Sequence, residues 1–129
     1  MALAESLSAA GIRYRKTRLK SGHAVDMEIE GVDGVPILLE IKSGASASDV
    51  HTGIGQLHLY RQLFTRMHQH RPVLLLGGPV PAPVAAAVER LGIALHHYIR
   101  EEDGQTNRIR FSSSFLALCG VEPTAVGPR

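Results

Sequence analysis

The distribution of apolar and polar positions predicts alternating helices and strands. Apolar residues recur at helical spacing near the start of the chain, and apolar and acidic residues alternate over residues 24–30. Three helices are expected. The first covers residues 3–10, the second runs from Ser48 or Thr52 to about residue 70, and the third covers 81–91. Expected strands cover residues 12–20 (a strand or an extended arm), 24–30, 35–42, 73–76, 93–99 and 109–111. The order, roughly α-β-β-β-α-β-α-β, predicts an α/β protein with a mixed β-sheet flanked by helices.

Length and composition narrow the class of protein. The chain has 129 residues, which suits a single domain; we expect it to cover residues 1–121, followed by a frayed tail over 122–129. Hydrophobic residues make up 44% and charged residues 20%, which excludes a wholly disordered chain. No apolar run approaches the roughly 20 residues of a membrane helix, and the first ten residues are not typical of a signal peptide. The single cysteine, Cys119, excludes an internal disulfide, so we expect a reducing, cytoplasmic location.

The net charge is only +2, but the basic residues are concentrated. One basic stretch has no acid within it and contains Arg13, Arg15, Lys16, Arg18 and Lys20. A second stretch contains Arg61, Arg66, His68, His70 and Arg71. Such stretches are either solvated faces or contacts for a polyanion, and charge alone does not separate the two.

The segments 24–30 and 35–42 are expected to pair as a hairpin. Pairing their apolar faces sets Met27 opposite Leu39, and the same register sets Asp26 opposite Glu40. Directly opposite side chains share one face of a sheet, and Lys42, two residues after Glu40, points to that face as well. The sequence therefore predicts two carboxylates and one ammonium group close together.

Two interpretations of this cluster remain open. The carboxylates of Asp26 and Glu40, with a backbone carbonyl near Ile41, are the oxygen ligands that Mg²⁺ takes. Alternatively, Lys42 compensates the two acids in an ion triad on the surface.

The helix that follows bears on this choice. Gln56 and Tyr60 are neighbours at i, i+4 spacing and share the apolar stripe that should face the sheet. An amide in that position needs a polar partner, which the acidic cluster would provide. If instead Gln56 lies close to the helix start, its amide reaches water.

The ordered set Asp26, Glu40-Ile41-Lys42 and Gln56 to Tyr60 resembles the PD-(D/E)xK nuclease superfamily. The glutamine-to-tyrosine helix motif is most similar to the RecB-like branch, although Val25 stands where the family name has proline. The motifs cover residues 24–60, and the α/β pattern extends to about residue 99. The resemblance implies a restriction-endonuclease-like core with the order α-β-β-β-α-β.

The resemblance also implies a function, namely hydrolysis of DNA phosphodiester bonds with Mg²⁺ or Mn²⁺. Asp26 and Glu40 would bind the metal, and Lys42 would orient or activate the attacking water. Gln56 and Tyr60 would position the lysine, the water shell of the metal or the DNA backbone. Our expectation is therefore a magnesium-dependent deoxyribonuclease.

Further expectations follow from the same resemblance. Some family members add an acid from the first helix, for which Glu5 is the candidate. The basic run from Arg13 to Lys20 would hold the phosphate backbone, and a homodimer is expected because many proteins of this fold form dimers. Two alternatives are a non-cleaving nucleic-acid-binding or scaffolding subunit and an RNA-directed or nucleotide phosphodiesterase.

Overall fold

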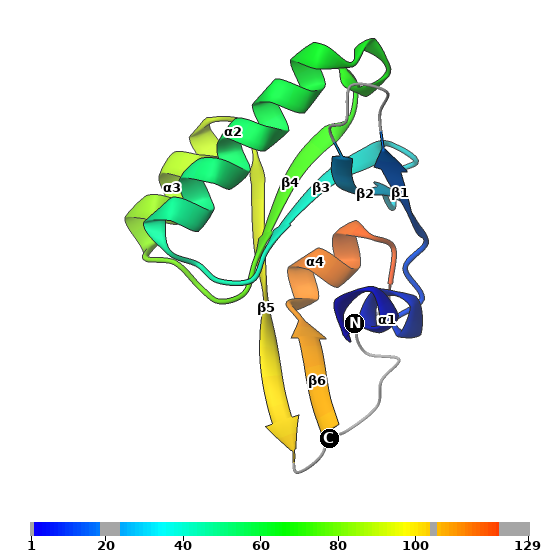
Figure 1. Ribbon diagram of the computed structural model, residues 1–129, viewed down its shortest axis with the longest axis vertical. Helices are drawn as coiled ribbons and strands as arrows, with labels where there is room; N and C mark the ends of the chain where they lie inside the picture. The colour runs from blue at the N-terminus through cyan, green and yellow to red at the C-terminus, as the bar shows by residue number, and fades with distance from the viewer. Residues whose placement is uncertain (1, 19–23, 104–105, 122–129) are drawn as a thin grey trace.

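A computed structural model describes residues 2–18, 24–103 and 106–121, without the side chains of 2–4, 16–18, 24–26, 102–103 and 106–107. The strands are β1 (Tyr14–Arg18), β2 (Ala24–Glu30), β3 (Pro36–Lys42), β4 (Arg71–Leu76), β5 (Ala94–Asp103) and β6 (Thr106–Phe111). The helices are α1 (Ala2–Ala9), α2 (Ala47–Leu63), α3 (Ala82–Arg90) and α4 (Ser113–Leu118), with a 3-10 turn η1 (Thr65–Met67). Figure 1 shows their arrangement.

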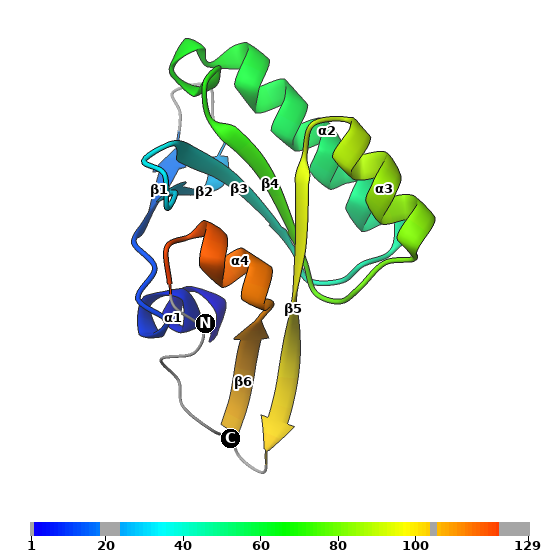
Figure 2. The ribbon, with the colours of Figure 1, turned by 180° about the vertical axis from the view of Figure 1, so that it is seen from behind.

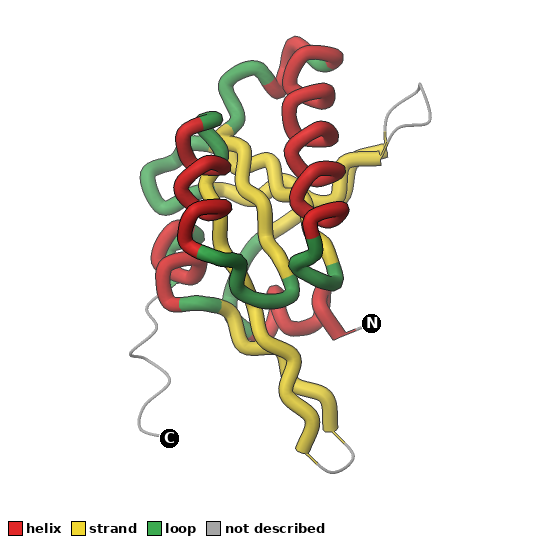
Figure 3. The backbone as a smooth tube through the Cα atoms, turned by 90° about the vertical axis from the view of Figure 1, so that its left-hand side faces the viewer, coloured by secondary structure: helices red, strands yellow, loops and turns green. Residues whose placement is uncertain are grey.

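The six strands form one mixed sheet in the order β1-β2-β3-β4-β5-β6. Strand β2 is antiparallel to both β1 and β3, whereas β4 is parallel to β3 and β5 is parallel to β4. Parallel neighbours need a crossover, and α2 and α3 provide the two crossovers. Strand β6 pairs antiparallel with β5, and this hairpin extends beyond the helices (Figure 3). The predicted α/β class with a mixed, helix-flanked sheet is confirmed.

The hairpin register is the predicted one. Met27 lies opposite Leu39 and Ile29 opposite Ile37. A slip of one residue would turn the apolar side chains of β2 to the other face, so the pattern selects this register.

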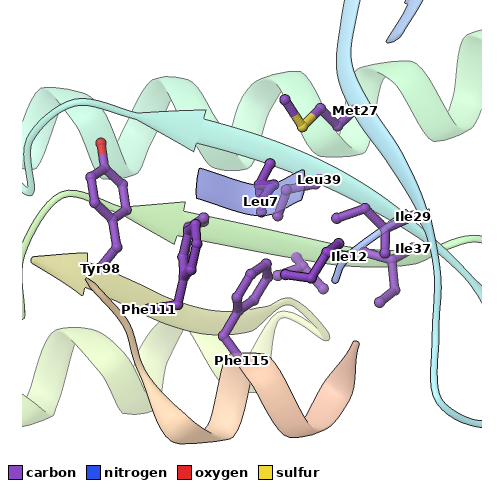
Figure 4. Packing of buried hydrophobic residues seen from close by; sticks show 11 residues of the cluster. Leu7, Ile12, Met27, Ile29, Ile37, Leu39, Tyr98, Phe111 and Phe115 are labelled. Carbon is purple, nitrogen blue, oxygen red and sulfur yellow. The ribbon is translucent and has the colours of Figure 1, made fainter. Parts of the chain in front are cut away.

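The sheet has an apolar core on each of its faces. Leu39 belongs to one cluster with Leu7 of α1 and Phe115 of α4 (Figure 4). Its neighbour Leu38 belongs to the other cluster, with Leu57 of α2. Helices α1 and α4 thus cover one face, and α2 and α3 cover the other (Figures 1 and 2). Burial on both faces explains why β3 and β4 are nearly continuous apolar runs.

The predicted start of the long helix is wrong. The N-cap of α2 is Ser46 rather than Ser48 or Thr52. The Ser46 hydroxyl accepts from the Asp49 backbone N–H (3.1 Å), and the Asp49 carboxylate accepts from the Ser46 backbone N–H (3.0 Å). This reciprocal capping box satisfies two helix-terminal donors and fixes where α2 begins.

The predicted end of that helix is also wrong. Helix α2 ends at Leu63, because Phe64 takes an extended backbone conformation with φ −120° and ψ 108°. Met67 is buried, but it is contributed by η1 and not by a continued helix. Met67 therefore fits the helical spacing of α2 but reaches the core from η1, which is a separate element.

Three other elements differ from the expectations. Helix α4 was not predicted, because its six residues are too few for a clear apolar period. Strands β5 and β6 are longer than expected, since they also pair along polar segments. The expected tail over 122–129 lies outside the described residues. In the described part of the chain, no helix is both long and apolar enough to cross a membrane.

Candidate active site

Strand β3 places Glu40 and Lys42 on the sheet face that α2 covers. Glu40 is 2% exposed, and the Lys42 side chain is 19% exposed. The Lys42 ammonium lies 3.5 Å from a carboxylate oxygen of Glu40. The two groups therefore form a partly buried ion pair, and its extension to a triad with Asp26 stays a prediction, because the Asp26 side chain lies outside the described residues.

Helix α2 brings Gln56 to the same point. The Lys42 ammonium donates to the Gln56 side-chain oxygen at 2.5 Å. The helix lies so close to the sheet here that a Cβ atom on Gly53 would collide with the side chain of Leu74 in β4. The prediction that the Gln56 amide meets a polar partner at the acidic strands is confirmed.

Tyr60 lies one helical turn after Gln56 and also faces the sheet. It is 6% exposed and belongs to the apolar cluster of Leu38 and Leu57. Its ring centroid lies 6.5 Å from that of Phe64. Tyr60 is therefore part of the apolar core beside Gln56, and a role in positioning Lys42 stays a prediction.

The carboxyl end of β3 is fixed by contacts that the sequence did not reveal. The Tyr98 hydroxyl of β5 donates to the Lys42 backbone carbonyl at 3.0 Å. Gly77 donates its backbone N–H to the carbonyl of Gly44, and a Cβ atom on Gly77 would collide with the carbonyl of Ser43. These contacts hold the backbone on which the Lys42 side chain is mounted.

The expected metal ligands are only partly described. The backbone of Asp26 is part of β2, but its side chain lies outside the described part of the chain, so its approach to Glu40 stays a prediction. The Glu40 carboxylate and the Ile41 backbone carbonyl are hard oxygen donors, the class that Mg²⁺ takes. No group of three or more His, Cys, Asp or Glu that could hold a metal occurs among the described residues. The donor chemistry is thus compatible with a hard cation, with Asp26 as the second carboxylate.

Glu5 is not brought to this site. It is exposed on α1, which packs on the opposite face of the sheet from α2. Its proposed participation therefore receives no geometric support.

The first basic stretch is described in part. Arg13 lies just before β1 and Arg15 lies within it, and both are exposed. A guanidinium nitrogen of Arg15 lies 3.5 Å from the Glu28 carboxylate. The side chains of Lys16 and Arg18, and the whole of Lys20, lie outside the described residues.

The sequence analysis did not predict a second polar cluster, in which basic side chains surround the Glu28 carboxylate. Glu28 is 6% exposed. Arg66 donates to both carboxylate oxygens at 2.7 and 3.1 Å, and His70 Nε2 lies 2.9 Å from one of them. The hydrogen bond with Glu28 raises the pKa of the Arg66 guanidinium. The available signals were the alternation of Glu28 with apolar residues in β2 and the second basic stretch, but nothing in the sequence paired them.

A partly buried ammonium held by a carboxylate and an amide is able to place positive charge at a fixed point beside bound anionic groups. No protein-family model matches this chain, and no curated protein sequence matches it.

Proposed function

We propose that this protein is a metal-dependent nuclease that hydrolyses DNA phosphodiester bonds. The observation that carries the proposal is the Lys42 ammonium, held between the Glu40 carboxylate and the Gln56 amide on a covered face of the sheet. These three residues belong to the ordered motif that resembles the PD-(D/E)xK superfamily.

A purely structural role explains this cluster less well. Removing a carboxylate and an ammonium from water costs several kcal/mol per ion, and apolar residues of similar volume usually stabilise a core at least as well. Buried ionisable groups with a specific partner are common at functional sites for this reason. Since Leu38 and Leu74 already fill the adjacent core, the ion pair favours a chemical role.

The element order supports the same proposal. From α1 to β4 the elements follow the order α-β-β-β-α-β. This is the order that the resemblance implies for the family core. Glu40 and Lys42 lie on the third strand and Gln56 on the following helix, as the motif requires.

Each residue has a chemical task under this proposal. Asp26, Glu40 and the Ile41 carbonyl would hold Mg²⁺ or Mn²⁺, which when bound lowers the pKa of a water and acts as a Lewis acid. The Lys42 ammonium would offset the negative charge that develops on the phosphoryl oxygens. Gln56 fixes the direction of the ammonium, because its amide oxygen accepts one of the three N–H donors.

A cleavage assay with matched variants tests the proposal. Wild-type protein should cut duplex or single-stranded DNA with Mg²⁺ or Mn²⁺ and should not cut with a chelator. Lys42→Met and Glu40→Gln should each lower the rate at least about 100-fold, because each removes a charge from the site. Gln56→Ala should lower it about 10- to 100-fold, because Lys42 would remain but lose its orientation.

Glu89→Gln is the control, since Glu89 is exposed on α3 and should leave the rate unchanged. Circular dichroism verifies that each variant is folded. Wild-type rates in folded Lys42→Met and Glu40→Gln would contradict the assignment. Salt-dependent DNA binding with no products, the same with metal and with chelator, would instead assign the chain to a non-cleaving nucleic-acid-binding subunit.

A further inference from the structure

A pocket of about 400 Å³ lies between strands β1 and β2 and the 3-10 turn η1. The charged residues that line it are Arg13, Arg15, Glu28, Glu30, Arg66 and His70. Three arginines face two glutamates, so the pocket is cationic even with His70 neutral. None of these residues belongs to the proposed catalytic set.

The wall of the pocket is a preorganised ion pair. Glu28 is 6% exposed and accepts two hydrogen bonds from the Arg66 guanidinium in a fork geometry. His70 Nε2 contacts the same carboxylate at 2.9 Å. Because Arg66 already compensates it, the Glu28 charge does not dominate the pocket.

Arg13 and Arg15 supply the accessible cations. Both side chains are exposed, and they lie two residues apart, the spacing that puts side chains on one side of an extended segment. Arg15 is 67% exposed, and its described ion pair with Glu28 is a long one of 3.5 Å. Each guanidinium has five N–H donors in a planar fork that matches the oxygens of a phosphate.

The pocket is close to the proposed catalytic residues. Glu28 lies opposite Leu38, which is two residues before Glu40 on β3. Two residues of a strand span about 7 Å. Arg15 lies opposite Glu28 on β1, so the pocket is displaced from Glu40 across two strands of the sheet as well as along them.

We propose that Arg13 and Arg15 together bind one backbone phosphate of a DNA strand in this pocket. This inference rests on the proposed function for the identity of the polyanion. It goes beyond that proposal by assigning the two arginines to a single phosphate in one defined pocket.

The salt dependence of binding tests how many phosphates the two arginines hold. The binding constant of the full chain for a fluorescein-labelled DNA duplex is measured by anisotropy over a range of NaCl concentrations, with chelator present to prevent cutting. Each phosphate contact contributes about 0.9 to the slope of log Kobs against log[NaCl]. The Arg13→Gln/Arg15→Gln double variant should lose about 0.9 relative to wild type, and the two single variants together should account for no more than that.

The Arg90→Gln/Arg100→Gln variant is the matched control. It removes the same charge from exposed arginines of α3 and β5 outside the pocket, and its slope should equal that of wild type. A loss of about 1.8 in the pocket double variant would mean two separate phosphates and would overturn the inference. An unchanged slope, or the absence of salt-dependent binding by wild type, would also overturn it.

A parallel cleavage assay of wild type keeps the two proposals distinguishable. Cleavage with metal together with an unchanged slope in the double variant would reject the pocket and retain the nuclease. The expected loss of slope without any cleavage would retain the phosphate pocket and reject the nuclease.

Discussion

Lys42 is held at both its side chain and its backbone. Its ammonium contacts Glu40 on the same strand and Gln56 on α2, and its carbonyl accepts a hydrogen bond from Tyr98 of β5. Three elements therefore determine where one positive charge lies. Such restraint from several directions is what electrostatic stabilisation of a transition state requires, because a loosely held charge would have to reorganise during the reaction.

Cys119 is a second residue whose environment sets its chemistry. Burial raises the pKa of its thiol to about 12 from the ordinary value of 9.0. Since the thiolate is the reactive form, we predict that the native protein reacts with a disulfide reagent at pH 8 much more slowly than the denatured protein does. Absorbance of the released thiolate measures both rates, and equal rates would contradict the prediction.

The same shift has a consequence for stability. The unfolded thiol loses its proton near pH 9.0, whereas the folded thiol keeps it to about pH 12. Below pH 9.0 the contribution of Cys119 to the free energy of unfolding is fully present. Between these two pH values that contribution falls as the pH rises, because the unfolded state then binds fewer protons than the folded state. Urea unfolding at pH 8 and pH 10, compared between wild type and Cys119→Ala, isolates this contribution; wild type should lose more stability than the variant.

The two polar clusters differ in how far the sequence could predict them. Glu40, Lys42 and Gln56 were placed together from strand alternation, hairpin register and helical spacing, all of which are local rules. Glu28 is instead bound by two distant residues, Arg66, 38 residues away, and His70, 42 residues away. Their meeting depends on where α2 ends and how η1 turns, which no local pattern specifies.

Helix α2 connects the core to the site, and its glycines serve different purposes. Gly53 is buried against Leu74, which leaves no room for a Cβ atom. Gly55 is exposed, with nothing within 4 Å of the position that a Cβ would occupy. Close approach of helix and sheet at Gly53 is what lets Gln56, three residues later, reach Lys42.

These two glycines give a matched pair of substitutions. Gly55→Ala should stabilise the protein by up to about 1 kcal/mol, because alanine favours the helix over glycine. Gly53→Ala should destabilise it by about 1–3 kcal/mol despite the same gain, because the added methyl group overpacks the core against Leu74. The free energy of unfolding in urea measures both effects. Equal changes in the two variants would contradict the packing of α2 on β4.

Hydrophobic periodicity predicted some of the helices and strands well and others poorly, depending on the length of the element. The alternation in β2 predicted the register with β3, because one slip would expose its whole apolar face. The end of α2 was not predicted, since Phe64 and Met67 continue the helical spacing although Phe64 leaves the helix. Helix α4 was missed because six residues hold less than two turns of pattern.

Over the described part of the molecule, one sheet separates two apolar cores, and the two polar clusters described above lie on the same face of it. The face covered by α2 and α3 contains Glu40, Lys42 and Gln56, and further along it the cluster of Glu28 and Arg66. The opposite face, under α1 and α4, is filled by apolar and aromatic side chains (Figure 4). The phosphate pocket and the proposed catalytic residues therefore belong to the same face of the sheet, the pocket at the β1 edge and Glu40 on β3.

The central claim is that Glu40 and Lys42 form a metal-dependent hydrolytic site, and a crystal soaked in Mn²⁺ tests it most directly. We predict an anomalous peak for Mn²⁺ next to the Glu40 carboxylate, where Asp26 would be the second carboxylate ligand. Lys42 should remain hydrogen-bonded to Gln56. No anomalous peak at Glu40, with Mn²⁺ bound elsewhere or nowhere and the ion pair with Lys42 unchanged, would contradict it.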